Sequence, residues 1–180
     1  MCGGRGSRLD STVEKPLFEI NGEPMLDRVL RALDESRTDG VFAAVSPHAP
    51  ETARFLETRP ISRIETPGDG YVADLEYALE HVDTPVLTVA ADLPLLEGEV
   101  VDSVLDVHDG GSLTVATPVA LKRVLGTSVD LILEHEGREL TPTGINVVGE
   151  SGETTTVTYD VRLAVNVNRR SDAEIAEVLS

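Results

Sequence analysis

The sequence predicts an α/β protein of the doubly wound, Rossmann-like kind, in which a mainly parallel sheet carries a small antiparallel extension. Segments with helical and strand-like patterns alternate over the first two-thirds of the chain. The last third has strand-like segments without long helices between them. With 180 residues, of which 41% are hydrophobic, the chain is long enough to form one domain over residues 1–180 around its own core.

Several segments carry apolar residues every three or four positions, which indicates helices with one buried face. Pro24 suits the first turn of the first of these helices, and Ser171 fits the N-cap of the last. We expect helices over residues 25–33, 52–57, 71–82, 97–108 and 172–179.

Short apolar runs with β-branched residues indicate buried strands. We expect these strands over residues 41–45, 86–91 and 113–117, and later over 129–133, 145–148, 155–159 and 163–167. The run 86–91 leads directly into Asp92, so this carboxylate should lie at the carboxyl end of a strand.

The first strand is missing from this pattern. In a sheet of this kind a glycine-rich loop normally follows a strand, yet here the loop begins at Gly3. We therefore expect either a central strand upstream of Met1 or a sheet that forms without it, and we favour the upstream strand.

The charge of the chain is strongly acidic. There are 32 acidic and 15 basic residues, and only two of the basic ones, Lys15 and Lys122, are lysines. The acids are spread along the chain, which predicts an acidic surface that repels nucleic acid and anionic membranes. Such a surface also repels itself at low salt, a pattern expected of halophilic proteins from a salt-loaded cytoplasm.

The single cysteine, Cys2, excludes an internal disulfide framework and a cysteine metal cluster, and we expect it to be a small packing residue. No apolar run reaches the roughly 20 residues of a membrane helix, and no secretory leader opens the chain. These observations predict a cytoplasmic protein without membrane partners. They leave a homodimer open.

The opening segment, residues 2–8 (CGGRGSR), combines three glycines with two arginines. Glycine allows backbone N–H groups to turn toward an anion, and Arg5 and Arg8 would add charge and directed donors. The spacing matches neither a Walker A loop nor the Rossmann fingerprint. Taken alone, the segment could equally be a frayed terminus.

Two charged residues strengthen the phosphate-binding interpretation. Lys15, in the segment EKP, is a compact charge on a flexible stem, suited to following a phosphate through a reaction. Asp92 would lie where ligands bind in open α/β sheets and could hold Mg²⁺, which often binds by one or two carboxylates plus phosphate oxygens. In isolation, Lys15 could be a surface residue and Asp92 could cap a turn.

The combination of GGRGSR, a short gap and EKP resembles the signature of the nucleotidyltransferases that include the sugar-phosphate and molybdenum-cofactor types. Further segments, in the same order, resemble the archaeal GTP:adenosylcobinamide-phosphate guanylyltransferases of cobalamin assembly. The resemblance covers nearly the whole chain except for the first strand. Its more specific parts are SPHAPET (46–52), GDGY (68–71) with a following DL (74–75), and GINVV (144–148), and VNVN (165–168) belongs to the same ordered set.

The resemblance implies roles for particular residues. It places Gly3, Gly4, Gly6, Arg8 and Lys15 around the triphosphate, Ser46, Pro47, Gly70 and Asp74 near the base and ribose, Asp92 on the metal, and Gly144, Asn166 and Asn168 near the reacting phosphates or the acceptor. Arg8, Lys15 and Asp92 would be the catalytic residues. Arg169 stands where the family commonly has Thr, which puts the role of Asn168 in question. Each assignment has a structural alternative: Gly70 could simply begin a helix, and Asn166 could satisfy a turn.

By this resemblance the protein transfers GMP from GTP to adenosylcobinamide phosphate, a corrinoid phosphate, with Mg²⁺ as cofactor. The four histidines show no ligand spacing, and an anionic phosphate nucleophile needs no base. One alternative keeps the chemistry and changes the acceptor to molybdenum cofactor or a sugar phosphate. Another is a GTP-sensing module without catalysis. The transferase interpretation requires Lys15 and Asp92 to meet in one pocket.

Overall fold

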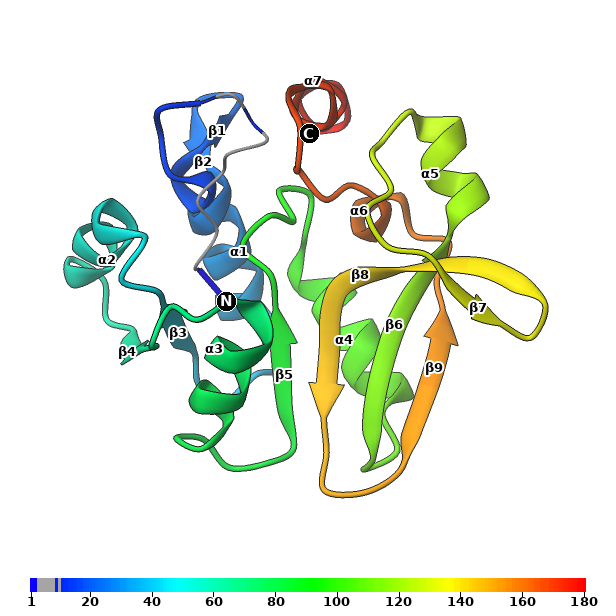
Figure 1. Ribbon diagram of the computed structural model, residues 1–180, viewed down its shortest axis with the longest axis horizontal. Helices are drawn as coiled ribbons and strands as arrows, with labels where there is room; N and C mark the ends of the chain where they lie inside the picture. Colours follow the sequence, from blue (N-terminus) through cyan, green and yellow to red (C-terminus); the bar gives the residue numbers. More distant parts are fainter. Residues whose placement is uncertain (3–8, 10) are drawn as a thin grey trace.

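The computed structural model describes residues 1–2, 9 and 11–180 (Figure 1). Its largest sheet contains β5 (Val86–Val89), β8 (Arg138–Val148), β6 (Ser112–Pro118) and β9 (Glu153–Val157) in that spatial order, with β7 (Leu133–His135) paired to β8. β8 is antiparallel to both β5 and β6, and β9 is parallel to β6. β5, β6 and β9 therefore run in one direction, and the expected α/β class with a small antiparallel extension is confirmed.

A parallel pair, β3 (Phe42–Val45) and β4 (Ser62–Glu65), lies beyond β5. Met1 and Cys2 occupy the position between β3 and β5 (Figure 1). The amino group of Met1 donates to the carbonyl of Val89 (2.9 Å), and the carbonyl of Met1 accepts from Ala91 (3.2 Å). On the other side, the N–H of Cys2 donates to the carbonyl of Ala44 (2.9 Å). These two residues thus lie where the expected first strand would lie.

Helices cover both faces of the sheet. They are α1 (Met25–Asp34), α2 (Pro50–Glu57), α3 (Tyr71–Leu79) and α4 (Gly98–Val107). Successive side chains of a strand point to opposite faces. Accordingly, Val45 packs with Leu26 of α1 and Leu56 of α2, whereas Ala44 packs with Ala78 of α3. Cys2 is buried in the first of these clusters, which confirms it as a packing residue.

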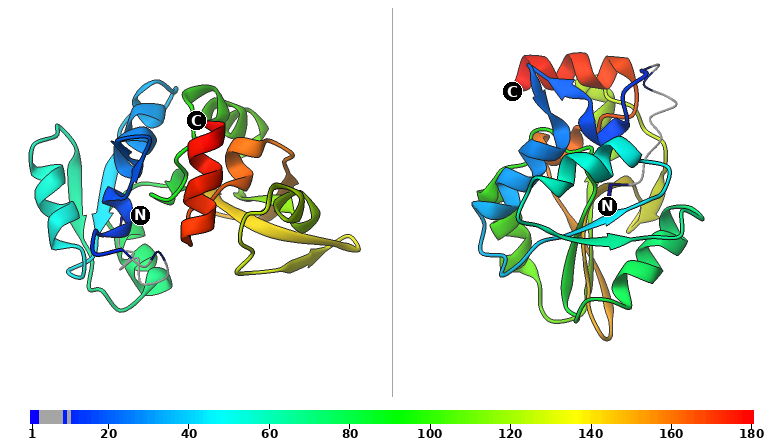
Figure 2. Two further views of the ribbon diagram at one scale, coloured as in Figure 1. Left: turned by 90° about the horizontal axis from the view of Figure 1, so that it is seen from above. Right: turned by 90° about the vertical axis from the view of Figure 1, so that its left-hand side faces the viewer.

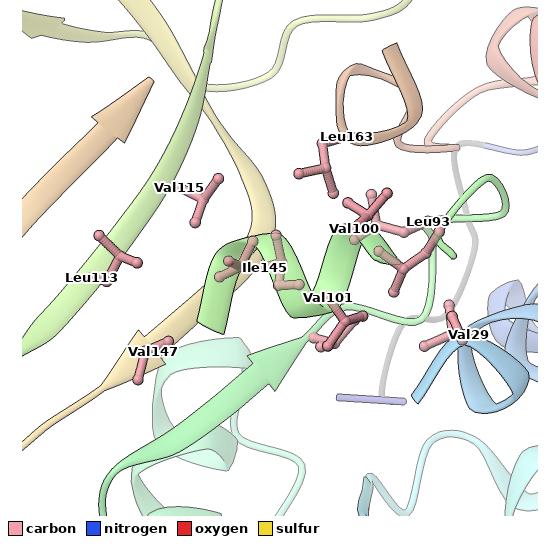
Figure 3. Packing of buried hydrophobic residues seen from close by; sticks show 13 residues of the cluster. Val29, Leu93, Val100, Val101, Leu113, Val115, Ile145, Val147 and Leu163 are labelled. Atoms are coloured by element: carbon pink, nitrogen blue, oxygen red, sulfur yellow. The ribbon is translucent and has the colours of Figure 1, made fainter. Parts of the chain in front are cut away.

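The main core lies between the five-stranded sheet and helices α1 and α4 (Figure 3). Val100 and Val101 of α4 pack there with Ile145 of β8 and Val115 of β6, and all four are at most 1% exposed. Burial of each such side chain contributes about 1.5–3 kcal/mol. This core fixes β5, and with it the position of the residues that follow the strand.

The remaining elements close one end of the molecule. They are the 3-10 helix η1 (Lys15–Leu17), strands β1 (Glu19–Ile20) and β2 (Glu23–Pro24), and helices α5 (Val119–Leu125), α6 (Val161–Ala164) and α7 (Arg170–Leu179). α7 packs between the β1–β2 hairpin and α6 (Figure 2), where Ala173 and Ala176 meet Ile20 and Val165. Among the described residues, no helix is long and apolar enough to cross a membrane.

Two expected strands are wrong. Residues 129–132 form no strand, because side-chain contacts tether this segment: the N–H of Ser128 donates to Asp172 and the carboxylate of Asp130 accepts from Arg169. Residues 163–167 begin inside α6, which starts because the Asp160 carboxylate caps the N–H of Arg162. The chain then becomes extended but forms no ladder. The sequence interpretation also overlooked β4, α5 and the first half of β8.

Candidate active site

Asp92 lies just beyond the carboxyl end of β5, as expected from the sequence. Its backbone carbonyl accepts the N–H of Val167 (3.0 Å), which brings the extended segment 165–168 alongside. Its side chain is 16% exposed, so the carboxylate is mostly enclosed but remains open to solvent. Asp92 can therefore contact a ligand that enters at this edge of the sheet.

Lys15 reaches the same point from the other side of the cleft. Its Nζ lies 2.5 Å from Oδ2 of Asp92 and 2.6 Å from Oδ1 of Asn168. Lys15 stands at the start of η1, whose Pro16 is buried and suits a first helical position. The expected meeting of Lys15 and Asp92 is thus observed.

Glu14 fixes the motif that carries Lys15. Its carboxylate accepts the backbone N–H groups of Glu51 (2.9 Å) and Thr52 (2.7 Å) and the hydroxyl of Thr52 (2.6 Å). These N–H groups belong to the first turn of α2, where a helix favours a negative charge. The EKP segment is therefore anchored on one wall of the cleft while Lys15 points across it.

Asn166 and Asn168 approach Asp92 and Lys15 from the segment that follows α6. The side-chain amide of Asn166 donates to the carbonyl of Thr143 (2.7 Å) and to Oδ1 of Asp92 (3.4 Å). The backbone N–H of Asn168 donates to Asp172, which is fully buried. Arg169, which departs from the family pattern, turns outward to Asp130, so Asn168 keeps its place at Lys15.

Gly144 allows Asn166 to come this close. Its φ of +88° lies in the region that favours glycine. A Cβ at this position would lie 3.1 Å from the amide nitrogen of Asn166 and 3.1 Å from Cβ of Ala90. The carbonyl of Gly144 also accepts the N–H of Ala90 (2.8 Å), which ties β8 to the end of β5.

A cleft of about 560 Å³ opens beside Lys15 and Asp92. Its volume is within the range of small-molecule sites, roughly 300–1,000 Å³. Five residues singled out from the sequence line it: Lys15, Ser46, Gly70, Asp74 and Asp92. His48, Asp69 and Tyr71, which the sequence did not single out, line it as well.

Two loops, residues 46–48 and 68–70, contribute to the wall of the cleft. The side chain of Pro47 closely contacts Gly68, where a Cβ would meet it at 2.8 Å, and His48 Nε2 lies 3.1 Å from the carbonyl of Gly68. Pro47 therefore supports the wall and does not itself line the cleft. Asp74 is buried and accepts the N–H of Gly68 (2.7 Å), which fixes the loop before α3.

Tyr71 stands at the first position of α3, on the rim of the cleft. Partial burial of the phenol, followed by the negative charge of Asp92, raises the pKa of Tyr71 above its ordinary value. The phenol therefore stays protonated at neutral pH and can donate a hydrogen bond to an anionic ligand.

Two buried charged residues behind the cleft were overlooked in the sequence. Lys122 is 3% exposed and donates to Oδ1 of Asn166 (3.1 Å), and Asp172 is 0% exposed. The scarcity of lysine, which drew attention to Lys15, applied equally to Lys122. The predicted phosphate-binding residues Gly3, Gly4, Gly6 and Arg8 lie outside the described residues.

The α/β sheet, with Lys15 and the strand-end Asp92 lining one cleft, can be compared with known proteins. A model of the MobA-like NTP transferase domain matches residues 1–168. The chain belongs to this family and is a nucleotidyltransferase.

Individual relatives refine this placement. The chain is 31% identical to an adenosylcobinamide-phosphate guanylyltransferase from Methanocaldococcus jannaschii, over 99% of this chain and 94% of the relative. A nucleotidyl transferase structure from Methanothermobacter superposes with a TM-score of 0.68 and 16% identity, covering 98% of this chain and 93% of that one. The structure of a CMP:2-keto-3-deoxy-manno-octonic acid synthetase complexed with CTP superposes with a TM-score of 0.64 and 16% identity, covering 96% of this chain and 95% of that one. The two structures share the fold with this chain.

Proposed function

We propose that the protein transfers GMP from GTP to adenosylcobinamide phosphate and releases pyrophosphate, a step of cobalamin biosynthesis. The observation that carries this proposal is that the Lys15 ammonium bonds both Asp92 and Asn168, and that Lys15 and Asp92 line the same cleft. The acceptor is proposed from the similarity to the guanylyltransferase of Methanocaldococcus jannaschii, which extends over 99% of the chain.

The reaction joins two anions. An oxygen of the acceptor phosphate attacks the α-phosphorus of GTP, a new P–O bond forms, and the bond between the α-phosphorus and the bridging oxygen breaks, so that pyrophosphate leaves with that oxygen. The acceptor is already anionic, so no side chain has to remove a proton. The protein must position the two phosphates and offset their charge.

Lys15 is the described residue best suited to offset that charge. Its ammonium lies at the cleft and is held by one carboxylate and one amide oxygen, and an arriving phosphate can replace either of them as acceptor. The glycines Gly3, Gly4 and Gly6 and the guanidinium of Arg8 are proposed to surround the same triphosphate.

Asp92 is proposed to hold Mg²⁺ together with the phosphates. The described residues include no group of three or more His, Cys, Asp or Glu side chains able to enclose a metal ion. One enclosed carboxylate beside a cation and an amide fits the way Mg²⁺ binds in nucleotide sites, where phosphate oxygens and water complete the coordination. When bound there, the ion would neutralise charge on the transferring phosphoryl group.

The base and ribose are proposed to lie against the loops that carry Ser46 and Gly70. Both residues line the cleft, and the backbone of Gly70 has a φ of +114°. Asp74 would act by holding this wall through Gly68, since one of its oxygens already accepts that N–H group. Pro47 would act in the same indirect way.

The test is an assay of the purified protein at high salt with GTP, Mg²⁺ and adenosylcobinamide phosphate. We expect pyrophosphate release together with the guanylylated corrinoid, detected by mass spectrometry. Molybdenum cofactor and sugar phosphates serve as competing acceptors, and UTP and CTP as competing donors. Turnover with another acceptor but not with the corrinoid would reject the proposed substrate, and tight GTP binding without pyrophosphate release from any acceptor would reject the enzyme activity.

A further inference from the structure

Lys122 is a buried cation directly behind the cleft. It lies in α5 and is 3% exposed, whereas its neighbour Arg123 points outward to Glu139, with both of those side chains about 60% exposed. Enclosing an ammonium group in a protein is costly unless its donors and its charge are matched. The partners of Lys122 therefore indicate what the residue does.

The donor character of Lys122 determines the orientation of the Asn166 amide. An ammonium group can only donate hydrogen bonds, so the amide atom that faces Nζ at 3.1 Å must be the oxygen. The NH₂ group of Asn166 then has to face the other way. There it meets two acceptors, the carbonyl of Thr143 and Oδ1 of Asp92.

The contacts from Lys122 through Asn166 lead to the carboxylate of Asp92. Oδ1 of Asp92 faces the NH₂ group of Asn166, and Oδ2 faces the ammonium of Lys15, so the two oxygens are held by different donors. If the Asn166 amide were reversed, its oxygen would face the carboxylate of Asp92 and repel it. Lys122 thus acts on Asp92 without contacting it.

The charges around Lys122 are consistent with this role. Asp172, Asp92 and Asp130 all favour its charged form, and Asp172 is itself fully buried. Burial acts in the opposite direction and is the larger effect, so it lowers the pKa of Lys122 below its ordinary value. The charge of Lys122 is therefore favoured by three carboxylates, while its side-chain hydrogen bond goes to Asn166.

We propose that Lys122 is a positioning residue that fixes the side-chain amide of Asn166 and, through it, the carboxylate of Asp92 for metal and nucleotide binding. The proposal rests on the proposed function for the role of Asp92. It requires no contact between Lys122 and either substrate.

The decisive experiment is a double-mutant cycle in the full chain, using Lys122→Met and Asn166→Ala. We expect Lys122→Met to lower kcat and the affinity for Mn²⁺ in the presence of GTP, measured by electron paramagnetic resonance, by roughly 10- to 100-fold, as supporting residues of metal sites do. In the Asn166→Ala background, Lys122→Met should lower kcat and the affinity for Mn²⁺ by less than about twofold. Arg123→Met, which removes a charge from the exposed face of the same helix, should leave both quantities unchanged.

Thermal unfolding of each variant shows whether it is folded. If Lys122→Met does not fold, Lys122→Arg replaces it as the informative variant, because it keeps a side chain that only donates and should preserve Mn²⁺ affinity within about fivefold. Three outcomes would each overturn the inference. The first is an equal loss from Lys122→Met in both backgrounds, and the second is an unchanged Mn²⁺ affinity in the folded single variant. The third is a loss of Mn²⁺ affinity beyond fivefold in folded Lys122→Arg. Absence of GMP transfer by the wild type would reject the proposed function alone, since Mn²⁺ binding still tests Lys122.

Discussion

The ammonium nitrogen of Lys15 lies 2.5 Å from a carboxylate oxygen of Asp92, although 77 positions separate the two residues in the chain. Lys15 comes from a short turn that Glu14 anchors on α2, whereas Asp92 comes from the end of the central strand β5. Two separately positioned segments thus deliver one cation and one anion to the same cleft. The two charges neutralise each other, and under the proposed function a metal–nucleotide complex would replace each of them as the other's partner.

Replacing Asp92 with Asn should remove most of the activity and little of the stability. The variant keeps the shape but loses the charge that would hold Mg²⁺, which we expect to cost about 4 kcal/mol of transition-state stabilisation, or roughly a thousandfold in kcat. Pyrophosphate release measures the activity, and thermal unfolding measures the fold. The control is Asp106→Asn, an exposed carboxylate paired with Arg37. Near-normal GMP transfer by folded Asp92→Asn would contradict the metal role.

Changes at Lys15 should distinguish charge from geometry. We expect Lys15→Met to lower kcat about 100- to 1,000-fold, comparable to the removal of one donor aimed at developing charge. Lys15→Arg keeps the charge but brings a rigid planar fork, so we expect a smaller loss of about tenfold. Steady-state kinetics with varied GTP measures kcat and KM for each variant. A change in KM alone would mean that Lys15 only binds the nucleotide.

The part of the fold that could be predicted is the part in which periodicity reflects burial. Val100, Val101 and Val104 of α4, for example, face the main core, and the helix ends within one residue of the expected boundary. The expected strand over 163–167 is wrong because a local cap decides its start: Asp160 begins a short helix in a segment whose composition favours a strand. Such a side-chain contact produces no periodic pattern of apolar residues, so the sequence pattern does not reveal it.

The residues at the site also differ in how far the sequence reveals them. The meeting of Lys15 and Asp92 in one cleft could be predicted because each belongs to a short segment with its own chemistry, EKP in one case and a strand-end aspartate in the other. Lys122 carries one signal in the sequence, the scarcity of lysine, but only the packing of α5 shows that it is buried. Asp172 looks like an ordinary first-turn acid, although its carboxylate also holds Ser128 from a distant loop.

Glu14 should contribute to stability through α2. Its carboxylate accepts three hydrogen bonds at the start of that helix, so we expect Glu14→Ala to lower the free energy of unfolding by about 2 kcal/mol. For a chain of this length the loss corresponds to a decrease in Tm of about 4–8 °C. Differential scanning calorimetry measures it, with the exposed Glu57→Ala at the other end of α2 as control. Equal Tm values for the two variants would show that the cap does not stabilise the helix.

Acid should remove the contribution of Asp160. Hydrogen bonds from the Arg162 side chain, more than any other contact, hold the pKa of Asp160 below its ordinary value of 3.8. A depressed folded-state pKa means that this stabilisation is complete above the unfolded-state value and is lost as the pH falls through the folded-state value. Asp160→Asn should therefore be less stable than wild type in urea unfolding at pH 7, and the difference should shrink below about pH 4. A difference that stays constant from pH 7 to pH 3 would exclude ionisation as its source.

Salt should stabilise the whole chain because its net charge is −17. Repulsion among exposed carboxylates is screened over about 10 Å at 0.1 M salt and over about 3 Å at 1 M, so Tm should rise steeply with KCl over this range. Three exposed acids can be changed together to Gln: Glu76 in α3, Glu80 at the C-cap of α3, and Glu174 in α7. This variant should have a higher Tm than the wild type at low salt. The difference in Tm should decrease as KCl increases, because salt then screens the same repulsion that the substitutions remove. A difference in Tm that is independent of salt would mean that the substitutions act through helix propensity and that repulsion does not limit the stability of this protein.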